Sequence, residues 1–275
     1  MTDSSIMLTI EEGKSEDIAI VPLCVSIAGI SYREYEEISA DQFMWHIDNG
    51  EIPSSSSPTL LDLKEAYDST DDEILHICMA DGLSSSYDSA SSYATSPEYV
   101  QRVQVINSRT LCMPQQHIVF RARDLAREGK TIPEIVDGIR EMIDSAASFL
   151  IPEDFDYLRR GGRLSAAAAG IMSILKTVPV LVQSVDGRKL EKLTISRKFD
   201  KAIHAVMVAL ESRGVDLSHR IDVSHAHNKK KAERAIELLR ERFPAIEIGL
   251  HELGPAFITQ GGPKCISIQS VRIVS

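Results

Sequence analysis

The chain has 275 residues, of which 43% are hydrophobic and 25% charged, so it is long enough to bury a sizeable core in one large or two ordinary domains. Its 40 acidic and 30 basic residues give a formal net charge of −10, which argues against nucleic acid as a partner because the phosphate backbone would be repelled. No apolar stretch approaches the ~18 residues of a membrane span and no signal-like segment follows Met1, so we expect a cytoplasmic protein without a membrane span.

The first half alternates short apolar runs with longer amphipathic ones, a pattern typical of strands connected by helices in a parallel sheet. The strands are predicted at 18–26, 75–79 and 103–106, the first of them at a sheet edge because Pro22 has no N–H to donate. The helices are predicted over 58–67, 84–94, 116–128 and 132–149. The last helix should begin with a capping box between Thr131 and Glu134.

A domain boundary is predicted near 151–152, where the last of these helices ends and a glycine-containing basic run begins. The strands predicted beyond it are 178–183, 189–196, 221–225, 246–250 and 265–269. The helices predicted beyond it are 199–213 and 229–243, the run 166–175 is small and apolar, and a glycine loop is expected from residue 254. The sequence therefore predicts an α/β protein of two α/β domains, a Rossmann-like parallel sheet over 1–152 and a mixed sheet over 153–275.

Two serine-rich segments are the most informative polar features. They are 54–57, followed by Pro58, and 84–86, which follows a predicted strand. Both resemble helix entrances, where free N–H groups and hydroxyls can hold an anion. The simpler alternative is that Ser57 and Ser84 only cap their helices. Because loops after parallel strands converge on one crevice, we expect the two segments to form a pocket together.

Other candidate centres are weaker. His225, His227 and His251 could share a site, but no cysteine or carboxylate set completes it, so no metal is predicted. The four cysteines have no paired spacing and are expected to be reduced, buried thiols. No serine lies in a nucleophile elbow, and the glycine pairs at 161–162 and 261–262 lack the rest of a phosphate-loop sequence. Basic residues between 159 and 198 form either a solvated face or a docking surface for an acidic or phosphate-bearing partner.

The order of several motifs resembles the DegV family, bacterial fatty-acid-binding proteins that include the lipid-carrying subunits of fatty acid kinase. The resemblance covers essentially the whole chain, and it depends on the order and spacing of these motifs together. The matching segments are Thr2-Asp3-Ser4-Ser5, Ile20-Val21-Pro22-Leu23, Pro53-Ser54-Ser55-Ser56-Ser57-Pro58, Gly82-Leu83-Ser84-Ser85-Ser86-Tyr87, Asn107-Ser108-Arg109, Gly161-Gly162-Arg163-Leu164-Ser165, Lys176-Thr177-Val178-Pro179-Val180, His225-Ala226 and Gly254-Pro255.

The resemblance implies an acyl chain in a tunnel between the two domains, with its carboxylate held by hydroxyls. By position these roles fall to Ser55 and Ser84, with Ser56 as a helper and Gln260 in place of a family histidine. Gln260 can donate a hydrogen bond but cannot shuttle a proton. Asp81 also departs from the family pattern, so we expect its carboxylate to face away from the ligand or to be bonded elsewhere.

The function implied is that of a carrier without a cofactor, whose ligand is a long-chain fatty acid. By resemblance it is not itself an enzyme and presents the carboxylate to a separate ATP-dependent fatty acid kinase, with Arg163 and Arg197 contacting that partner or its phosphate. One alternative is an enzyme for a small acyl or anionic substrate, with Ser84 as nucleophile and His225 or His251 as base. The other is a lipid sensor without a kinase partner.

Overall fold

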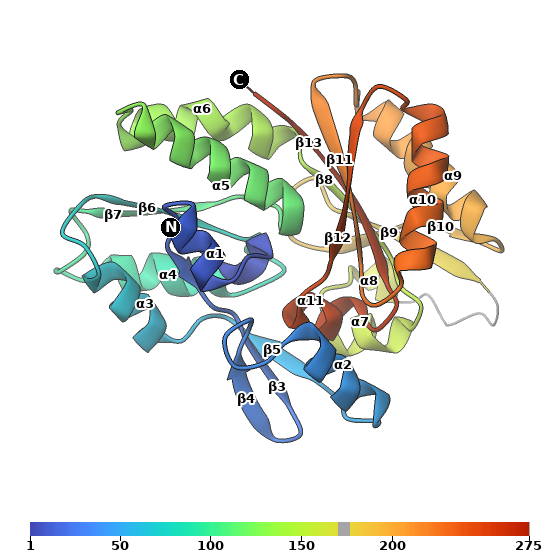
Figure 1. Cartoon of the computed structure of the whole chain (residues 1–275), viewed down its shortest axis with the longest axis horizontal. Helices are drawn as coiled ribbons and strands as arrows, with labels where there is room; N and C mark the ends of the chain where they lie inside the picture. The colour runs from blue at the N-terminus through green and yellow to red at the C-terminus, as the bar shows by residue number, and fades with distance from the viewer. Residues whose placement is uncertain (170–176, 275) are drawn as a thin grey trace.

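The computed structural model describes residues 1–169 and 177–274 and arranges them in three sheets (Figure 1). A four-stranded and a six-stranded sheet stand side by side, and a three-stranded sheet projects below them. The first is parallel and the second mixed, which confirms the predicted α/β class. Within the described ranges, no helix has both the length and the apolar character that crossing a membrane requires.

The four-stranded sheet has the strand order β2-β1-β6-β7, and all its pairs are parallel. Its strands are β1 (Thr2–Asp3), β2 (Ile20–Val21), β6 (Ile74–Cys78) and β7 (Val103–Asn107). The elements around it are η1 (Ser4–Ile6), α1 (Ile10–Ser15), α3 (Leu60–Asp68), α4 (Ser86–Ala94), α5 (Cys112–Arg127) and α6 (Ile132–Ser145). Helices cover both faces because side chains alternate along β6: Ile77 packs with α5 and α6, whereas Cys78 packs with α3 and α4. The predicted capping box at Thr131 is present.

Pro22 divides the strand predicted at 18–26. β2 ends at Val21 and lies at the sheet edge as expected, whereas the chain beyond Pro22 enters the three-stranded sheet. The central strand β1 was not predicted from its polar sequence. Its Asp3 is completely buried, where it accepts hydrogen bonds from the backbone N–H groups of Ser5 and Met79 and from the Gln115 side chain. Burial raises the pKa of Asp3, and these hydrogen bonds oppose that rise.

The six-stranded sheet has the order β10-β9-β8-β13-β11-β12, with β11 and β12 as its parallel pair. Its strands are β8 (Ala147–Ile151), β9 (Val178–Gln183), β10 (Leu190–Ser196), β11 (His219–His225), β12 (Glu247–Glu252) and β13 (Ile266–Arg272). The associated helices are α7 (Phe155–Gly161), α8 (Ala166–Ala169), α9 (Phe199–Ser212), α10 (Lys229–Arg242) and α11 (Pro255–Gly261). α9 and α10 pack on one face around Phe149, Val223 and Ile268. α8 is the described part of the small apolar run 166–175, and residues 170–175 lie outside the described ranges.

The prediction of a helix over 132–149 was wrong for its last turn. α6 ends at Ser145, and the apolar run that follows is β8, which pairs with β13 and β9. A strand buried on both faces has a continuous apolar sequence, so its periodicity does not distinguish it from a buried helix. The chain therefore passes from the elements around the four-stranded sheet to the six-stranded sheet near residue 146. The division into domains at residues 152 and 153 stays a prediction.

The three-stranded sheet was not predicted, and it brings one serine segment into position. It contains β3 (Cys24–Ile27), β4 (Ile30–Arg33) and β5 (Ser54–Ser56) in the order β4-β3-β5, with α2 (Ala40–Asp48) between β4 and β5 in the chain. β5 consists only of serines, which have little tendency to form strands, so propensity gave no signal for it.

A buried carboxylate holds the start of α11. Glu34, directly after β4, is 1% exposed, and its Oε1 accepts a hydrogen bond from the Ala256 N–H at 2.8 Å. Its Oε2 accepts from the Ser4 hydroxyl at 2.7 Å. Burial raises the pKa of Glu34 to about 7, and the two hydrogen bonds oppose this change.

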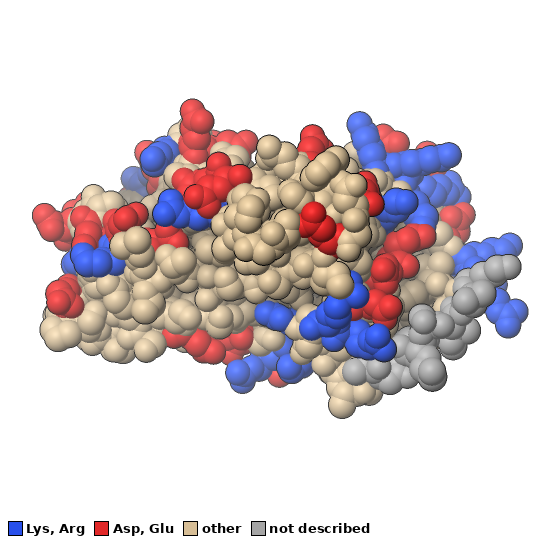
Figure 2. Space-filling model, turned by 90° about the horizontal axis from the view of Figure 1, so that it is seen from below, with Lys and Arg blue, Asp and Glu red and all other residues tan. Residues whose placement is uncertain are grey.

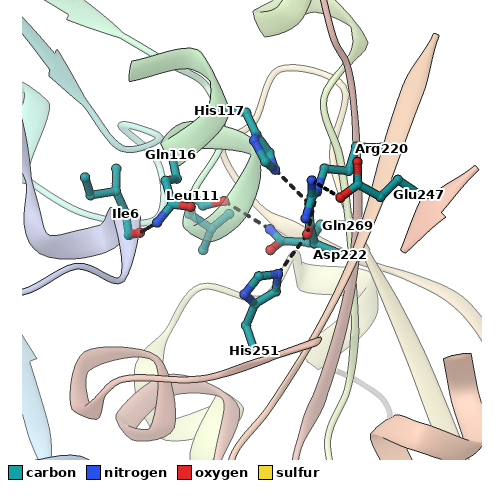
Figure 3. Close-up of polar contacts among 9 residues, drawn as sticks. All are labelled: Ile6, Leu111, Gln116, His117, Arg220, Asp222, Glu247, His251 and Gln269. Atoms are coloured by element: carbon teal, nitrogen blue, oxygen red, sulfur yellow. Dashed lines mark hydrogen bonds and ion pairs between the residues drawn. The ribbon is translucent and has the colours of Figure 1, made fainter. Parts of the chain in front are cut away.

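Polar contacts join α5 to the six-stranded sheet (Figure 3). Asp222 in β11 is 1% exposed and accepts hydrogen bonds from His117 Nε2 of α5 at 3.0 Å and His251 Nε2 of β12 at 2.8 Å. Arg220 Nε lies 3.3 Å from the same carboxylate. Burial by itself would raise the pKa of Asp222, yet the hydrogen bonds from the two histidines keep it below its usual value.

The Asp222→Ala variant should lose about 3–5 kcal/mol of unfolding free energy near neutral pH, because the hydrogen bonds that this buried carboxylate accepts from His117 and His251 would be lost together with its contact to Arg220. The folded-state pKa is lower than the unfolded one, so this contribution is complete above about pH 4 and disappears as the pH falls through more acidic values. Urea unfolding at several pH values measures the difference. Asp137→Ala, at an exposed ion pair, is the control and should change stability by less than about 1 kcal/mol. An equally small loss of unfolding free energy in Asp222→Ala would contradict the stabilising role of the Asp222 hydrogen bonds.

Glu34→Gln should stabilise the protein increasingly as the pH rises. The folded-state pKa of about 7 exceeds the unfolded value of 4.5, so the folded state loses stability as the pH rises from the unfolded value through the folded one. The amide of Gln does not ionise, so the variant avoids this loss. Its free energy of unfolding should exceed that of the unchanged protein by up to about 3 kcal/mol above neutral pH. Urea unfolding of both proteins in acidic and alkaline buffers tests this, with Glu36→Gln beside Arg33 as the control. A difference that does not change with pH would refute it.

Candidate functional site

A cavity of about 250 Å³ lies where the three sheets meet, and its walls come from both halves of the chain. β5, the segment before α4 and the start of α5 contribute from the first half, and α7, β8, β10, α11 and β13 from the second. Most of the wall is apolar. The apolar lining residues are Leu23, Met79, Leu83, Leu111, Cys112, Phe149, Leu150, Leu158, Leu190, Leu253, Ala256, Phe257 and Cys265.

Both serine segments line this cavity, as predicted, and the second lies at the entrance of α4, whereas the first forms β5 instead of a helix entrance. Ser55, Ser56 and Ser57 contribute from β5 and the residue after it. The helix that follows begins at Leu60, and its cap is Thr59, whose hydroxyl accepts from the Asp62 N–H at 3.1 Å. The prediction that Ser57 caps this helix was therefore wrong.

Ser55 is fixed by a residue from the other half of the chain. Gln260 Nε2 in α11 donates a hydrogen bond to Ser55 Oγ at 2.9 Å. Because Gln260 is the donor, the Ser55 hydroxyl proton remains available for another acceptor. Gly161 at the end of α7 permits this arrangement, since a Cβ atom there would lie 2.2 Å from Gln260 Oε1.

Ser84 precedes α4 and makes a local hydrogen bond. Its Oγ accepts from the Ser86 N–H at 3.1 Å and lies 2.8 Å from Ser86 Oγ. The helix itself begins at Ser86 with Ser85 as its N-cap residue. The cavity thus receives hydroxyl groups from β5 on one side and from the start of α4 on the other.

Arg163 is the one charged residue of the cavity lining within residues 1–169 and 177–274. Its Nε donates to the Leu83 carbonyl at 3.1 Å, and the guanidinium also donates to the Gly161 carbonyl. Burial lowers the pKa of Arg163, but an arginine remains protonated at physiological pH. Arg197, the other predicted basic contact, is exposed directly after β10, outside the cavity lining.

The carboxylate of Asp81 is directed to an ion pair. Asp81 Oδ2 lies 3.1 Å from Arg188 Nη2, and Asp81 is absent from the cavity lining. The loop approaches the turn before β10 closely, because a Cβ atom at Gly82 would lie 2.2 Å from the Arg188 carbonyl oxygen. This agrees with the expectation that Asp81 is bonded away from the ligand.

The three histidines lie elsewhere. His225, His227 and His251 line a shallow surface pocket with Asp41 and Glu252, and among the described residues no histidine lines the cavity. His251 is bonded to Asp222, and Ser84 to Ser86, so the structure does not pair Ser84 with either predicted base. In the described part of the chain, no group of three or more His, Cys, Asp or Glu side chains could hold a metal ion.

Sequence reasoning missed two parts of the site. α11, which carries Ala256, Phe257 and Gln260, was interpreted as a glycine loop, although Pro255 at its first position indicates a helix start. The polar cavity residues Ser148 and Gln269 were missed as well, the first because β8 was assigned to a helix. The cysteines are free and buried as predicted.

Comparisons with known proteins agree with this geometry. The sequence model of a family described as "Uncharacterised protein, DegV family" matches residues 1–272. Protein DegV of Bacillus subtilis is 27% identical over 278 residues, covering 98% of this chain and 96% of that protein. The crystal structure of that DegV, described as a fatty acid binding protein, gives a TM-score of 0.82 at 26% identity over 98% of this chain and 97% of its own.

A Thermus thermophilus DegV family protein, described by its fatty acid binding, has the same fold. Its TM-score is 0.86 at 23% identity, over 98% of both chains. Since the family match extends over nearly the whole sequence, the chain belongs to the DegV family.

Proposed function

We propose that the protein binds a long-chain fatty acid in this cavity, with the acyl chain along the apolar walls and the carboxylate among Ser55, Ser56, Ser84 and Gln260. The observation that carries the proposal is a single cavity whose walls are mostly apolar and which contains both hydroxyl segments and one arginine. Because the walls come from both halves of the chain, the cavity would serve as a tunnel between two domains. The fatty acid binding described for the Bacillus and Thermus relatives supports this choice of ligand.

The two ends of such a ligand require different surroundings. Each buried methylene contributes ~0.8 kcal/mol, so a long acyl chain is held mainly by its length. A carboxylate buried without partners costs several kcal/mol, so it needs donors. The free proton of Ser55 and the hydroxyl of Ser84 provide hydrogen bonds, and the Arg163 charge compensates the negative charge.

We further propose that the protein is a carrier and that a separate ATP-dependent fatty acid kinase phosphorylates the carboxylate. Two observations support this division of roles: Ser84 has no base beside it within the described ranges, and the chain resembles the lipid-carrying subunits of such kinases. The cytoplasm, where thiols stay reduced, suits the four free cysteines.

The partner would approach from the side where positive charge collects. Seen from below, Lys and Arg side chains gather toward the half that holds the six-stranded sheet (Figure 2). Exposed basic residues lie in the segments that surround α7 and β10. They are Arg159, Arg160, Arg188, Lys189, Lys192, Arg197 and Lys198. Arg163 would then stabilise phosphate charge at the cavity while Arg197 contacts the kinase.

Replacing both Ser55 and Ser84 by alanine should weaken fatty acid retention by about 10–100-fold, because a charged head group loses two donors. Delipidated protein is titrated with a fluorescent fatty acid and competed with palmitate. Ser92→Ala, an exposed position on α4, is the control and should bind as the unchanged protein does. Equal binding by the double variant would place the carboxylate elsewhere.

The isolated chain should form no acyl phosphate from ATP, and adding a fatty acid kinase should start the reaction. Arg197→Glu should lower that coupled rate by about tenfold through loss of attraction across an interface, without changing fatty acid retention. Arg140→Glu, exposed on α6, provides the control. An unchanged coupled rate in Arg197→Glu would remove this residue from the interface, and acyl phosphate made by the chain alone would disprove the carrier role.

A further inference from the structure

One wall of the cavity is polar at a place where an acyl chain needs none. Side chains alternate along β13, so Ile266 and Ile268 pack under α9 and α10, whereas Ser267 and Gln269 line the cavity, as does Ser148 of β8. All three are less than a tenth exposed. They form one cluster because Gln269 is paired with Ser148 in the register of the two strands.

Hydrogen bonds fix the orientation of the Gln269 amide. Its Nε2 donates to the Leu111 carbonyl at 3.0 Å (Figure 3). The same nitrogen also donates to Ser148 Oγ at 2.8 Å. A flipped amide would place two oxygens against each other at Leu111, so the nitrogen must lie on that side. Gln269 Oε1 is consequently a buried acceptor without a partner among the described residues.

The serines of the cluster have unused hydrogen-bonding capacity as well. Ser148 accepts from Gln269, which leaves its hydroxyl proton without a described acceptor. The Ser267 hydroxyl makes no hydrogen bond with residues 1–169 and 177–274, although it lines the cavity. The cluster thus offers two hydroxyls of cavity-lining residues and, beside them, one buried acceptor.

The cluster extends along β13 away from α11, which carries Gln260 of the proposed carboxylate site. Cys265 packs under α11, since a Cβ atom at Gly261 would lie 2.7 Å from its Sγ. Gln269 follows four residues later along β13, about 13 Å from Cys265 at the rise of a strand. Gln269 is therefore displaced along the cavity wall from the residue that packs under α11.

Resting on the proposed function, we propose that the preferred ligand is a hydroxylated long-chain fatty acid, whose hydroxyl group is bound by Ser148, Ser267 and Gln269. A hydroxyl fits because it both donates and accepts: it donates to Gln269 Oε1 and accepts from a serine. A keto group could only accept, and a plain hydrocarbon would cover the cluster without pairing it, which is unfavourable for buried polar groups.

The test compares ligands of equal length. Delipidated protein is titrated in competition assays with stearic acid and with hydroxystearic acids that differ in the position of the hydroxyl group. At least one hydroxystearic acid should bind about tenfold more tightly than stearic acid, the effect of one or two hydrogen bonds. Ser267→Ala and Gln269→Leu should each remove most of this preference while stearic acid still binds.

A matched control lies on the same strand. Ser270 is a buried serine on the opposite face of β13, and Ser270→Ala should leave the ratio of the two affinities unchanged. Tight binding of stearic acid with equal or weaker binding of every hydroxystearic acid would overturn the hydroxyl site and leave the proposed function intact. Binding of none of these acids would overturn both.

Discussion

The hydrogen bond from Gln260 to Ser55 connects the two halves of the chain at the cavity. It joins α11 to the small sheet that carries β5, and α11 is itself held at its start by the buried carboxylate of Glu34. Because a glutamine amide does not titrate near neutral pH, this arrangement keeps the Ser55 proton free over a wide pH range. A histidine at the same position would couple the proposed head-group site to pH.

Positions on strands, rather than on helices, determine most of the cavity chemistry. β5, β8 and β13 all direct side chains into the cavity, alternate ones in the case of β13, and the opposite face of the large sheet is filled by α9 and α10. The same alternation that builds a conventional core under those helices exposes serines and a glutamine to the cavity. The packing of α9 and α10 on one face of the six-stranded sheet therefore determines which polar side chains line the cavity on the other face.

Much of the fold followed from sequence periodicity, and the failures have physical causes. α9, α10 and β11 were predicted within a few residues, because amphipathic helices and apolar strands between polar turns carry strong signals. β1 and β5 are built from polar residues whose strand conformation depends on tertiary contacts, such as the hydrogen bonds to Asp3. The serine segments were located correctly at the cavity. The local structure around the first, 54–57, was not predicted correctly, since Thr59 rather than Ser57 caps the helix that follows.

A crystal structure of the protein loaded with a long-chain fatty acid tests the central claim most directly. The account predicts electron density for one acyl chain inside the cavity, with its carboxylate in hydrogen-bonding distance of Ser55 and Ser84 and its chain passing Phe257. A lipid bound on the outer surface, or a cavity that stays empty after loading, would contradict it.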